Sequence, residues 1–435
     1  MKLGFASVLA SLAALSVTAQ DQTPPPCQTS WVRKEIRNMT PNEWAIFNGV
    51  QNSMHRDGWY DWYSQIHNTL AGLIHSNSLF FPFHRQFILD FESTMKRYDP
   101  KAFLPYWNSM VDFQRPDKSP VLSSQFLGSN GVAGSQCVKD GLPQNWNRKY
   151  PRSGCMQRKY NGPGGNSINP LYSPEAISYF MQISSTYKDL RNNIENSIHG
   201  AVHLGISADM ATMNAPNDPV FWLHHANIDR IWSNWQSSDL TKRQYMYDGT
   251  NAYGQPVYLT DTLPNYPNVK VNQVMAVGRG SMCYSYDDKP AQGSLSRRDL
   301  AQTVSSLVTL PQNILDKFFP AVTNGTYNEF LDETVTNLLP TTVPNVMQAN
   351  GVYSLNLTDV TKPLLKALGS DKPAGGKDCD CNSKVQMPKP APLTTAWLKM
   401  NKISPCKAGK VHKLASDFTD ELNRSDYISK FVLRY

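Results

Sequence analysis

Residues 218–230 read DPVFWLHHANIDR. Asp218 followed by Pro219 predicts the start of a helix, because the aspartate side chain caps free backbone N–H groups and proline is tolerated at the first helical position. The helix is expected to continue to Trp235 and to carry His225 about one and a half turns from its start. A histidine in that position, among aromatic residues, is a candidate metal ligand.

Six of the nine histidines fall into two groups whose spacing is typical of metal sites. The first group consists of His67, His75 and His84. The second group consists of His199, His203 and His225. Residues four apart lie on one helix face, so His199 and His203 can share an ion, with His225 supplied from a facing helix. A single histidine is usually a core or surface residue, but two such groups in a histidine-poor chain predict bound metal.

The donor set bears on which metal is bound. Zinc is the commonest alternative to copper. Zinc hydrolases, however, commonly include a carboxylate or thiolate ligand and a general base beside the metal. Two all-imidazole sets favour copper. Three neutral nitrogen ligands around each of two copper ions would leave positions open for dioxygen.

Length and composition limit the other functions. The 435 residues allow one large domain with an appendage, or two domains, and 40% hydrophobic content is enough for a sizeable core. The net charge of +7 is spread along the chain without a block of Lys or Arg, so no nucleic-acid partner is expected. Beyond the N-terminus no stretch reaches the ~18 apolar residues needed to span a bilayer, so no membrane partner is expected either. The oligomeric state is left open.

The N-terminus predicts export. Lys2 precedes an apolar run from Leu3 to Leu15, and the small residues that follow fit cleavage after Ala19. Residues 1–19 are therefore interpreted as a signal peptide rather than a buried helix, and the mature protein is expected to be secreted.

In a secreted chain the seven cysteines are disulfide candidates. Cys137 and Cys155 flank a Gly/Pro/Asn-rich loop that a bridge between them could close, and the odd count leaves at least one thiol over. Four sequons are candidate glycan sites, at Asn38, Asn324, Asn356 and Asn423.

Caps and apolar periodicity predict a mainly α-helical protein. A capping box at Thr40–Glu43 predicts a helix that ends near Met54. Phe80–Phe83 is expected to interrupt the chain, and residues 108–170 are expected to form long loops. Residues 247–286 are expected to form loops and short strands. Further helices are predicted over residues 59–67, 84–98, 187–203 and from Ser173.

A change of character near residues 287–298 predicts a domain boundary. The segment is polar and contains the dibasic pair Arg297-Arg298, which is either incidental or a processing site. Residues 299–435 contain amphipathic segments, such as Pro311–Phe319 and Tyr327–Leu339, but no histidine cluster. The expected division is a catalytic domain over 20–290, a linker over 291–298 and a C-terminal extension over 299–435.

Two motifs carry a resemblance to a known family. Phe81–Arg85, which reads FPFHR, and residues 218–230 resemble the two copper signatures of the type-3 copper family: tyrosinases, catechol oxidases and molluscan-type hemocyanins. The resemblance covers about residues 31–286 and includes Arg33 and the pair Tyr284-x-Tyr286, which are similar to the family's arginine and its domain-closing tyrosine motif.

The resemblance implies a mainly α fold with a four-helix-bundle core around a binuclear copper site. It implies that His67, His75 and His84 hold one copper and that His199, His203 and His225 hold the other. His224 then corresponds to a neighbour of the ligands and Phe221 to the aromatic residue packed beneath the metals, although simple core packing explains Phe221 as well. Asn227, in the same motif, is a further candidate.

Departures from the family pattern bear on the chemistry. Leu73 stands where many members carry the cysteine that forms a thioether to the middle histidine, so the loop of His75 is expected to be fixed by packing alone. Glu195 resembles a glutamate that holds a water molecule, but Gly200 stands where efficient monophenol hydroxylators have Asn or Asp beside that water.

A missing base should hurt monophenols more than the more acidic catechols, because a phenol must lose its proton before it binds copper. The alternative is that Glu195 or solvent removes the proton and Gly200 changes little. Gly200 and Leu204 are also expected to leave a roomy, apolar mouth. Thr212 or Met213 stands where the family often has a gate residue.

The expected activity is oxidation of o-diphenols to o-quinones by O2, with weaker hydroxylation of monophenols. The alternatives are a full tyrosinase, a hemocyanin-like O2 carrier and a structural dizinc protein. The C-terminal extension resembles the segment that covers the active site of latent family members until it is cleaved. It is otherwise a docked helical extension with no gating role.

Overall fold

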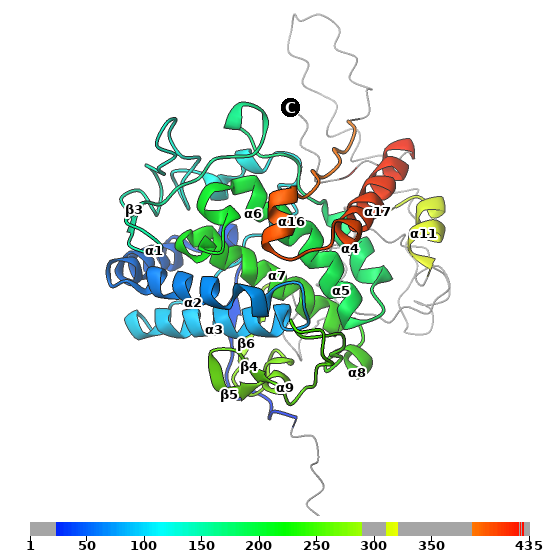
Figure 1. The fold of residues 1–435 in the computed structure, drawn as a ribbon, viewed down its shortest axis with the longest axis horizontal. Coiled ribbons are helices and arrows are strands. Elements are labelled where there is room, and N and C mark those ends of the chain that lie inside the picture. Colours follow the sequence, from blue (N-terminus) through cyan, green and yellow to red (C-terminus); the bar gives the residue numbers. More distant parts are fainter. Residues whose placement is uncertain (1–22, 289–309, 321–384, 426, 428, 430–435) are drawn as a thin grey trace, which may run out of the picture.

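The computed structural model describes residues 23–288, 310–320 and 385–425, together with Tyr427 and Ser429. Helices dominate these residues and the strands are short, which confirms the expected mainly α fold (Figure 1). Within this part of the chain no helix is long and apolar enough to cross a membrane. Several sequence predictions lie outside the described residues: the signal peptide, the pair Arg297-Arg298 and the segment Tyr327–Leu339.

The helices of the core lie together in the centre of Figure 1. α3 packs against α7, α1 packs against both α2 and α3, and α4 packs against α5. The main helices of the core are α1 (Pro41–Arg56), α2 (Trp59–Ile74), α3 (Phe80–Tyr98), α4 (Pro174–Ile183), α5 (Tyr187–Ile194), α6 (Gly200–Ile206) and α7 (Pro219–Ser237). The shorter elements are β2 (Asn147–Arg148), β3 (Gly154–Cys155), α8 (Leu240–Arg243), β4 (Thr262–Leu263), β5 (Tyr266–Lys270) and α9 (Val271–Val274).

The predicted helix starts are confirmed where a cap defines them. Thr40 and Glu43 form the reciprocal capping box of α1. Ser173 accepts from the N–H of Ala176 at the start of α4. Asp218 accepts from the N–H of Val220 at the start of α7. In each case the side-chain oxygen pairs a backbone donor that the helix itself cannot satisfy.

The predicted interruption at Phe80–Phe83 is wrong. α3 begins at Phe80 and includes Pro82 as its third residue. Proline is tolerated there because the first four N–H groups of a helix have no partner within the helix, so the missing donor costs nothing. α2 is also longer than expected and continues from Trp59 to Ile74.

The helix predicted over 187–203 is confirmed, but a wide turn interrupts it. α5 ends at Ile194, a single wide turn of π-helix occupies Glu195–His199, and α6 begins at Gly200. Ser197 lies inside this turn with φ −126° and ψ −107°, outside helical geometry. Wide turns of this kind insert one extra residue into a helix and are frequent at functional sites.

The long loops over 108–170 are confirmed apart from short 3-10 turns and one two-stranded ribbon. The ribbon pairs β2 with β3, and the expected disulfide between Cys137 and Cys155 closes this region. A second disulfide, between Cys27 and Cys283, was not predicted.

A parallel pair of strands joins the two ends of the core. β1 (Trp31–Arg33) pairs with β6 (Tyr284–Tyr286), next to the Cys27–Cys283 disulfide. Arg33 is fully buried and donates to Glu92 of α3 at 2.6 Å. The N-terminal strand is thereby tied to the bundle that holds the histidines.

Asp229, one turn after His225 in α7, is the centre of this closure. Its carboxylate lies 2.5 Å from Arg85 and 3.5 Å from Arg33, and it accepts from the hydroxyls of Tyr284 at 2.6 Å and Tyr286 at 2.5 Å. Burial opposes ionisation of Asp229, but the two arginines and the two hydroxyls outweigh burial and hold its pKa below the ordinary value. The arginine and tyrosines singled out in the sequence therefore meet at one buried carboxylate.

The C-terminal segment packs on the same core. α11 (Gln312–Phe318) and α17 (Pro405–Arg424) lie side by side next to α4, and α16 (Thr395–Met400) lies over α6 (Figure 1). Tyr179 of α4 stacks on Phe418 of α17, with ring centroids 5.0 Å apart. The amphipathic segment expected over Pro311–Phe319 is thus confirmed as a helix.

Replacing Asp229 with alanine is expected to lower the free energy of unfolding by about 3–5 kcal/mol, because it leaves two buried guanidinium groups short of their counter-charge. The test is urea unfolding of the metal-free protein, followed by circular dichroism. The matched control is Tyr286→Phe, which removes one hydrogen bond and should cost only about 1 kcal/mol. A midpoint for Asp229→Ala equal to that of the unchanged protein would contradict the role given to this carboxylate.

Candidate metal centre

The first histidine cluster is assembled as the sequence predicts. His67 lies in α2, His75 follows the last residue of α2, and His84 lies in the second turn of α3. The three ring centroids are 5.0 to 5.6 Å apart, and one nitrogen from each ring lies within 4.8 Å of the others. All three side chains are buried.

Backbone carbonyl groups fix the orientation of four of the histidine rings. His67, His75, His84 and His203 each place Nδ1 within hydrogen-bond distance of a carbonyl oxygen. The accepting carbonyls belong to Met213, Ala71, Phe80 and Met210, at 2.8, 3.1, 2.7 and 2.6 Å respectively. A carbonyl can only accept, so Nδ1 carries the proton and Nε2 keeps the lone pair that a metal needs.

The second cluster contains His199, His203 and the doublet at 224 and 225. By distance alone, the nitrogens that converge within 4.8 Å belong to His199, His203 and His224. We nevertheless propose His225 as the third ligand. Nε2 of His224 lies 3.2 Å from the carbonyl oxygen of His199 and is engaged there, whereas both ring nitrogens of His225 are buried without a protein partner.

His225 also faces the first cluster. Its ring stacks on that of His84, with centroids 4.4 Å apart and an interplanar angle of 13°. Its centroid lies 5.2 Å from that of His199 and 5.6 Å from that of His203. The two clusters are therefore adjacent, so the ions that they bind would form a pair.

Burial keeps these imidazoles neutral. Loss of solvation lowers the pKa of His67 and of His203 to about 3 and that of His75 to about 4. The same cause, with repulsion from neighbouring histidines, holds the pKa values of His84 and His225 well below the ordinary range. Neutral imidazole is the form that binds a transition metal.

The residues present fit a pair of copper ions. Buried ring nitrogens without a protein partner occur on His199, His203, His225 and, through Nδ1 alone, His224. Such atoms are costly unless a ligand or water pairs them. Among the described residues, the groups that converge on these positions are imidazoles and no carboxylate joins them. An all-nitrogen donor set suits copper.

Phe221 and Asn227 lie close to these ligands on α7. The ring of Phe221 packs between the clusters, 4.2 Å from His225 and 5.2 Å from His67 by centroid. Asn227 is fully buried, and its amide oxygen accepts from Arg230 at 3.2 Å. The amide oxygen is therefore directed at Arg230 of the same helix rather than at a metal.

Glu195 is engaged by protein groups on both carboxylate oxygens. Oε1 accepts from the backbone N–H of Ser76 at 2.6 Å, and Oε2 accepts from Arg191 at 2.8 Å. Burial raises the pKa of Glu195, and Arg191 and Ser76 oppose that shift. The expectation that packing alone fixes the loop of His75 is therefore wrong, because Glu195 holds the residue after that histidine.

The open mouth expected beside Gly200 is wrong, because the C-terminal segment covers Gly200. Trp397 of α16 lies over the second cluster, with its ring centroid 5.2 Å from that of His203 and 6.0 Å from that of His199. A Cβ atom placed on Gly200 would stand 2.8 Å from Leu393 and 2.9 Å from Nε1 of Trp397. Gly200 therefore leaves room for the C-terminal segment.

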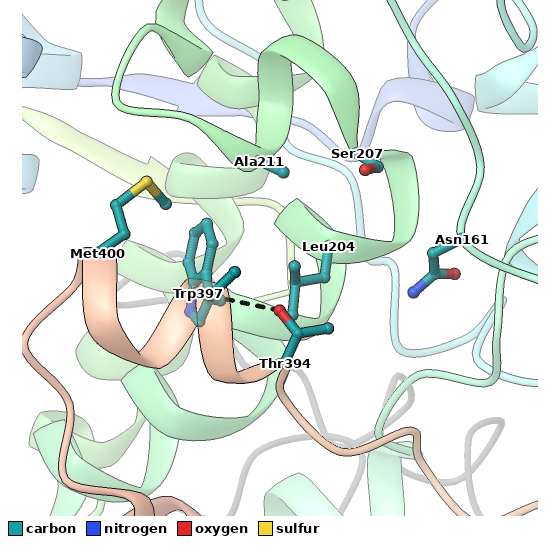
Figure 2. A pocket seen from close by; sticks show the side chains of 8 residues that line it. Asn161, Leu204, Ser207, Ala211, Thr394, Trp397 and Met400 are labelled. Carbon is teal, nitrogen blue, oxygen red and sulfur yellow. Dashed lines mark hydrogen bonds between the residues drawn. The ribbon is translucent and has the colours of Figure 1, made fainter.

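A pocket of about 310 Å³ remains beside Trp397, between α6 and α16. Figure 2 shows Trp397 and Met400 from α16 on one side of it and Leu204 and Ser207 on the other. Of the two gate candidates, Thr212 donates to the carbonyl of Asp209, and Met213 supplies the carbonyl that orients His67.

Two buried histidine clusters that face each other among helices fit a binuclear metal site. Residues 41–238 match the family model described as the common central domain of tyrosinase. The chain is 31% identical over 227 residues to a tyrosinase of Streptomyces antibioticus, which covers 47% of this chain and 82% of that protein. The chain belongs to the tyrosinase family of type-3 copper proteins.

Two more distant likenesses complete the comparison. Tyrosinase ustQ of Aspergillus flavus is 29% identical over 301 residues, covering 62% of this chain and 84% of that protein. The structure of a polyphenol oxidase variant from Thermothelomyces thermophila is 19% identical, with a TM-score of 0.47, and covers 60% of this chain and 90% of that one. The second likeness is too weak to bear on function.

His225→Gln is expected to reduce the bound copper from about two ions per chain to about one, because it removes a ligand of the second ion. His224→Gln is the matched control on the adjacent residue and should retain both ions. The measurement is copper per folded chain after dialysis, by elemental analysis. Loss of one ion from the His224 variant but not from the His225 variant would reverse the assignment.

Proposed function

We propose that the chain is a secreted polyphenol oxidase that uses O2 to oxidise o-diphenols to o-quinones, with weaker hydroxylation of monophenols. The observation that carries the proposal is the pair of facing, all-imidazole clusters. The relatives named above are tyrosinases. A bound copper pair would supply the redox chemistry: two diphenols each lose two electrons and two protons, and one O2 becomes two molecules of water.

The residues of the chain provide the setting for that chemistry. The buried imidazoles are held neutral, and backbone carbonyls hold their lone pairs inward. The ring of Phe221 packs against His67 of one cluster and His225 of the other and contributes an apolar wall there. A dry, shaped cavity with oriented ligands is what a protein contributes to metal-ion catalysis.

The preference for diphenols rests on which group could remove a proton from a bound phenol. Gly200 has no side chain with which to orient a water molecule. Glu195 already accepts from Ser76 and Arg191, so its oxygens are directed at the His75 loop and at α5. These contacts support Glu195 as a structural residue and weaken the alternative in which it acts as the base. Catechols are more acidic than monophenols and depend less on such a base.

Two alternatives remain in competition. A full tyrosinase would hydroxylate monophenols as efficiently as it oxidises diphenols. A hemocyanin-like O2 carrier is favoured by one specific observation: the C-terminal segment covers the second cluster, as an attached domain covers the coppers of a carrier. A carrier would bind O2 reversibly and leave catechol colourless even after the segment is displaced.

We further propose that the C-terminal extension shields the site. Trp397 is only 4% exposed, and it sits above His203 with Leu393 beside Gly200. Its indole N–H is buried without a protein partner. An unpaired buried donor costs about 1–3 kcal/mol. Packing alone therefore holds the side chain of Trp397 in place, and this cost favours its release.

The extension is also anchored by α17 and by the residues that follow it. α17 packs on α4 and on the wide turn Glu195–His199, and the hydroxyls of Tyr427 and Ser429 donate to buried Glu175 at 2.7 and 2.6 Å. A cut near Arg297-Arg298 would leave these contacts in place. Cleavage of the linker is therefore expected to activate the chain only when α16 also dissociates from α6 and the second histidine cluster.

The proposed reaction predicts a clear order of rates. After copper loading and displacement of α16, an o-diphenol such as 4-methylcatechol should consume O2 and give a coloured quinone at least about tenfold faster than 4-methylphenol, since the chain provides no oriented base. The measurement is initial O2 uptake for this matched pair. Similar rates would favour the full tyrosinase, and reversible O2 binding without quinone would favour the carrier.

The shielding proposal predicts that Trp397→Ala activates the uncut chain. Truncation of a buried tryptophan typically costs about 3–5 kcal/mol of packing, so the covered state should lose its advantage and catechol kcat/KM should rise by roughly tenfold or more. Gly200→Asn should act in the same direction, because its Cβ would collide with Leu393 and Trp397. Lys399→Ala, an exposed position on the same helix, is the control and should change little. If all three variants turn over catechol at the rate of the unchanged protein, α16 is a docked extension without a gating role.

A further inference from the structure

The loop that carries His75 is held from two sides. His75 follows the end of α2 in extended conformation, and Ser76 after it has a positive φ of 60°. A residue with a Cβ atom is uncommon in the left-handed region and persists there only when its surroundings hold it. The backbone N–H and the side-chain hydroxyl of Ser76 each donate a hydrogen bond that holds this conformation.

The two partners of Ser76 belong to different parts of the chain. Its backbone N–H donates to Glu195 at 2.6 Å, within the core. Its hydroxyl donates at 2.5 Å to the backbone carbonyl of Asn401, the residue that ends α16. Ser76 therefore connects the residue that follows a candidate metal ligand to the C-terminal segment.

The turn that ends α16 fits this contact. Asn401 is buried, and its side-chain amide donates back to the carbonyl of Trp397 at 3.1 Å. Lys402 follows with a positive φ of 54° and reaches over α2, where its Nζ lies 3.3 Å from the place that a Cβ on Gly72 would occupy. The end of α16 thus rests on the last turn of α2, while Trp397 rests on the other cluster.

The remaining bonds of the loop lie within the turn or join it to the core. Ser78 donates from its N–H to the carbonyl of Thr250 at 3.0 Å and from its hydroxyl to the carbonyl of Asp248 at 2.7 Å. Asn77 donates to the carbonyls of Leu73 and His75 at 2.9 and 2.8 Å and accepts from the N–H of Leu79 at 2.9 Å. These bonds shape the turn itself. The contact of Ser76 with Asn401 is the one that makes the position of the loop depend on whether α16 is docked.

We propose that Ser76 is a positioning residue that couples the C-terminal segment to the first histidine cluster. While α16 is docked, the contact between Ser76 and Asn401 braces the loop of His75, and undocking loosens the hold of that histidine on its metal. The inference rests on the copper centre and the docked extension proposed above. Its consequence is that the shielded chain retains the first copper ion more tightly than the open chain does.

The test uses the full-length, copper-loaded protein with EDTA as the competing chelator. Ser76→Ala removes the hydroxyl, and Lys402→Pro breaks the turn from the other side, because proline cannot adopt a positive φ. Lys402→Gly, which keeps the positive φ, is the matched control. The first readout is the rate of copper release, with the His225→Gln variant used to identify the phase that belongs to the first cluster.

Ser76→Ala and Lys402→Pro are each expected to speed release from the first cluster about fivefold, which corresponds to the loss of one hydrogen bond of about 1 kcal/mol. The double variant should release copper no faster than either single variant, because both changes remove the same contact. Release from the second cluster should not respond to Ser76→Ala.

The second readout is amide hydrogen exchange over residues 75–79 in the metal-free protein. Exchange there should rise about fivefold in both variants but not in Lys402→Gly, in line with a lost bond of about 1 kcal/mol. Unchanged exchange, or additive effects of the two substitutions on release, would overturn the coupling. This readout needs neither copper nor turnover. It therefore tests whether the contact between Ser76 and Asn401 stabilises the loop of His75 even if the protein oxidises no catechol.

Discussion

Every imidazole of the two clusters is buried, so each must remain neutral and each must present a lone pair in a fixed direction. Burial meets the first requirement by lowering the pKa of the rings. For His67, His75, His84 and His203, backbone carbonyls meet the second, because a carbonyl beside Nδ1 fixes both the tautomer and the rotation of the ring. Much of the surrounding structure places these carbonyls where the rings need them: the long α2, the early start of α3 and the short turns around Met210 and Met213.

α7 is the element on which the clusters and the closure of the core both depend. Its N-terminal cap, Asp218, pairs with buried Arg158 at 2.7 Å. His225 lies in its second turn and contacts both clusters. One turn later, Asp229 gathers Arg33 and Arg85 from other elements. A change at either buried ion pair would therefore move a metal ligand as well as weaken the fold.

Local signals in the sequence were sufficient for the caps and for the histidine groups. Thr40, Ser173 and Asp218 act on backbone atoms two or three residues away, and the spacing within each histidine group reflects helix geometry directly. The wide turn at Glu195–His199 has no such signal, since one inserted residue leaves the apolar pattern almost unchanged. Pro82 misled the prediction because proline is as acceptable in a first helical turn as it is disruptive later.

The contacts of the C-terminal segment were beyond sequence reasoning for a different reason. Gly200 and Trp397 are far apart in the chain, and no periodicity links them. The absence of a side chain at Gly200 was interpreted as a missing partner for a water molecule, whereas the structure adds a steric reason for glycine there. Likewise, Leu73 suggested a loop held by packing, and the hydrogen bonds of Ser76 to both Glu195 and Asn401 were not foreseen.

The central claim is that two clusters of three imidazoles hold a pair of copper ions. It is tested most directly by anomalous diffraction at the copper absorption edge from crystals of the copper-loaded, full-length protein. We expect two adjacent peaks, one bound by His67, His75 and His84 and the other by His199, His203 and His225. A single peak, a carboxylate in either ligand set, or a second ion bound through His224 in place of His225 would contradict the claim.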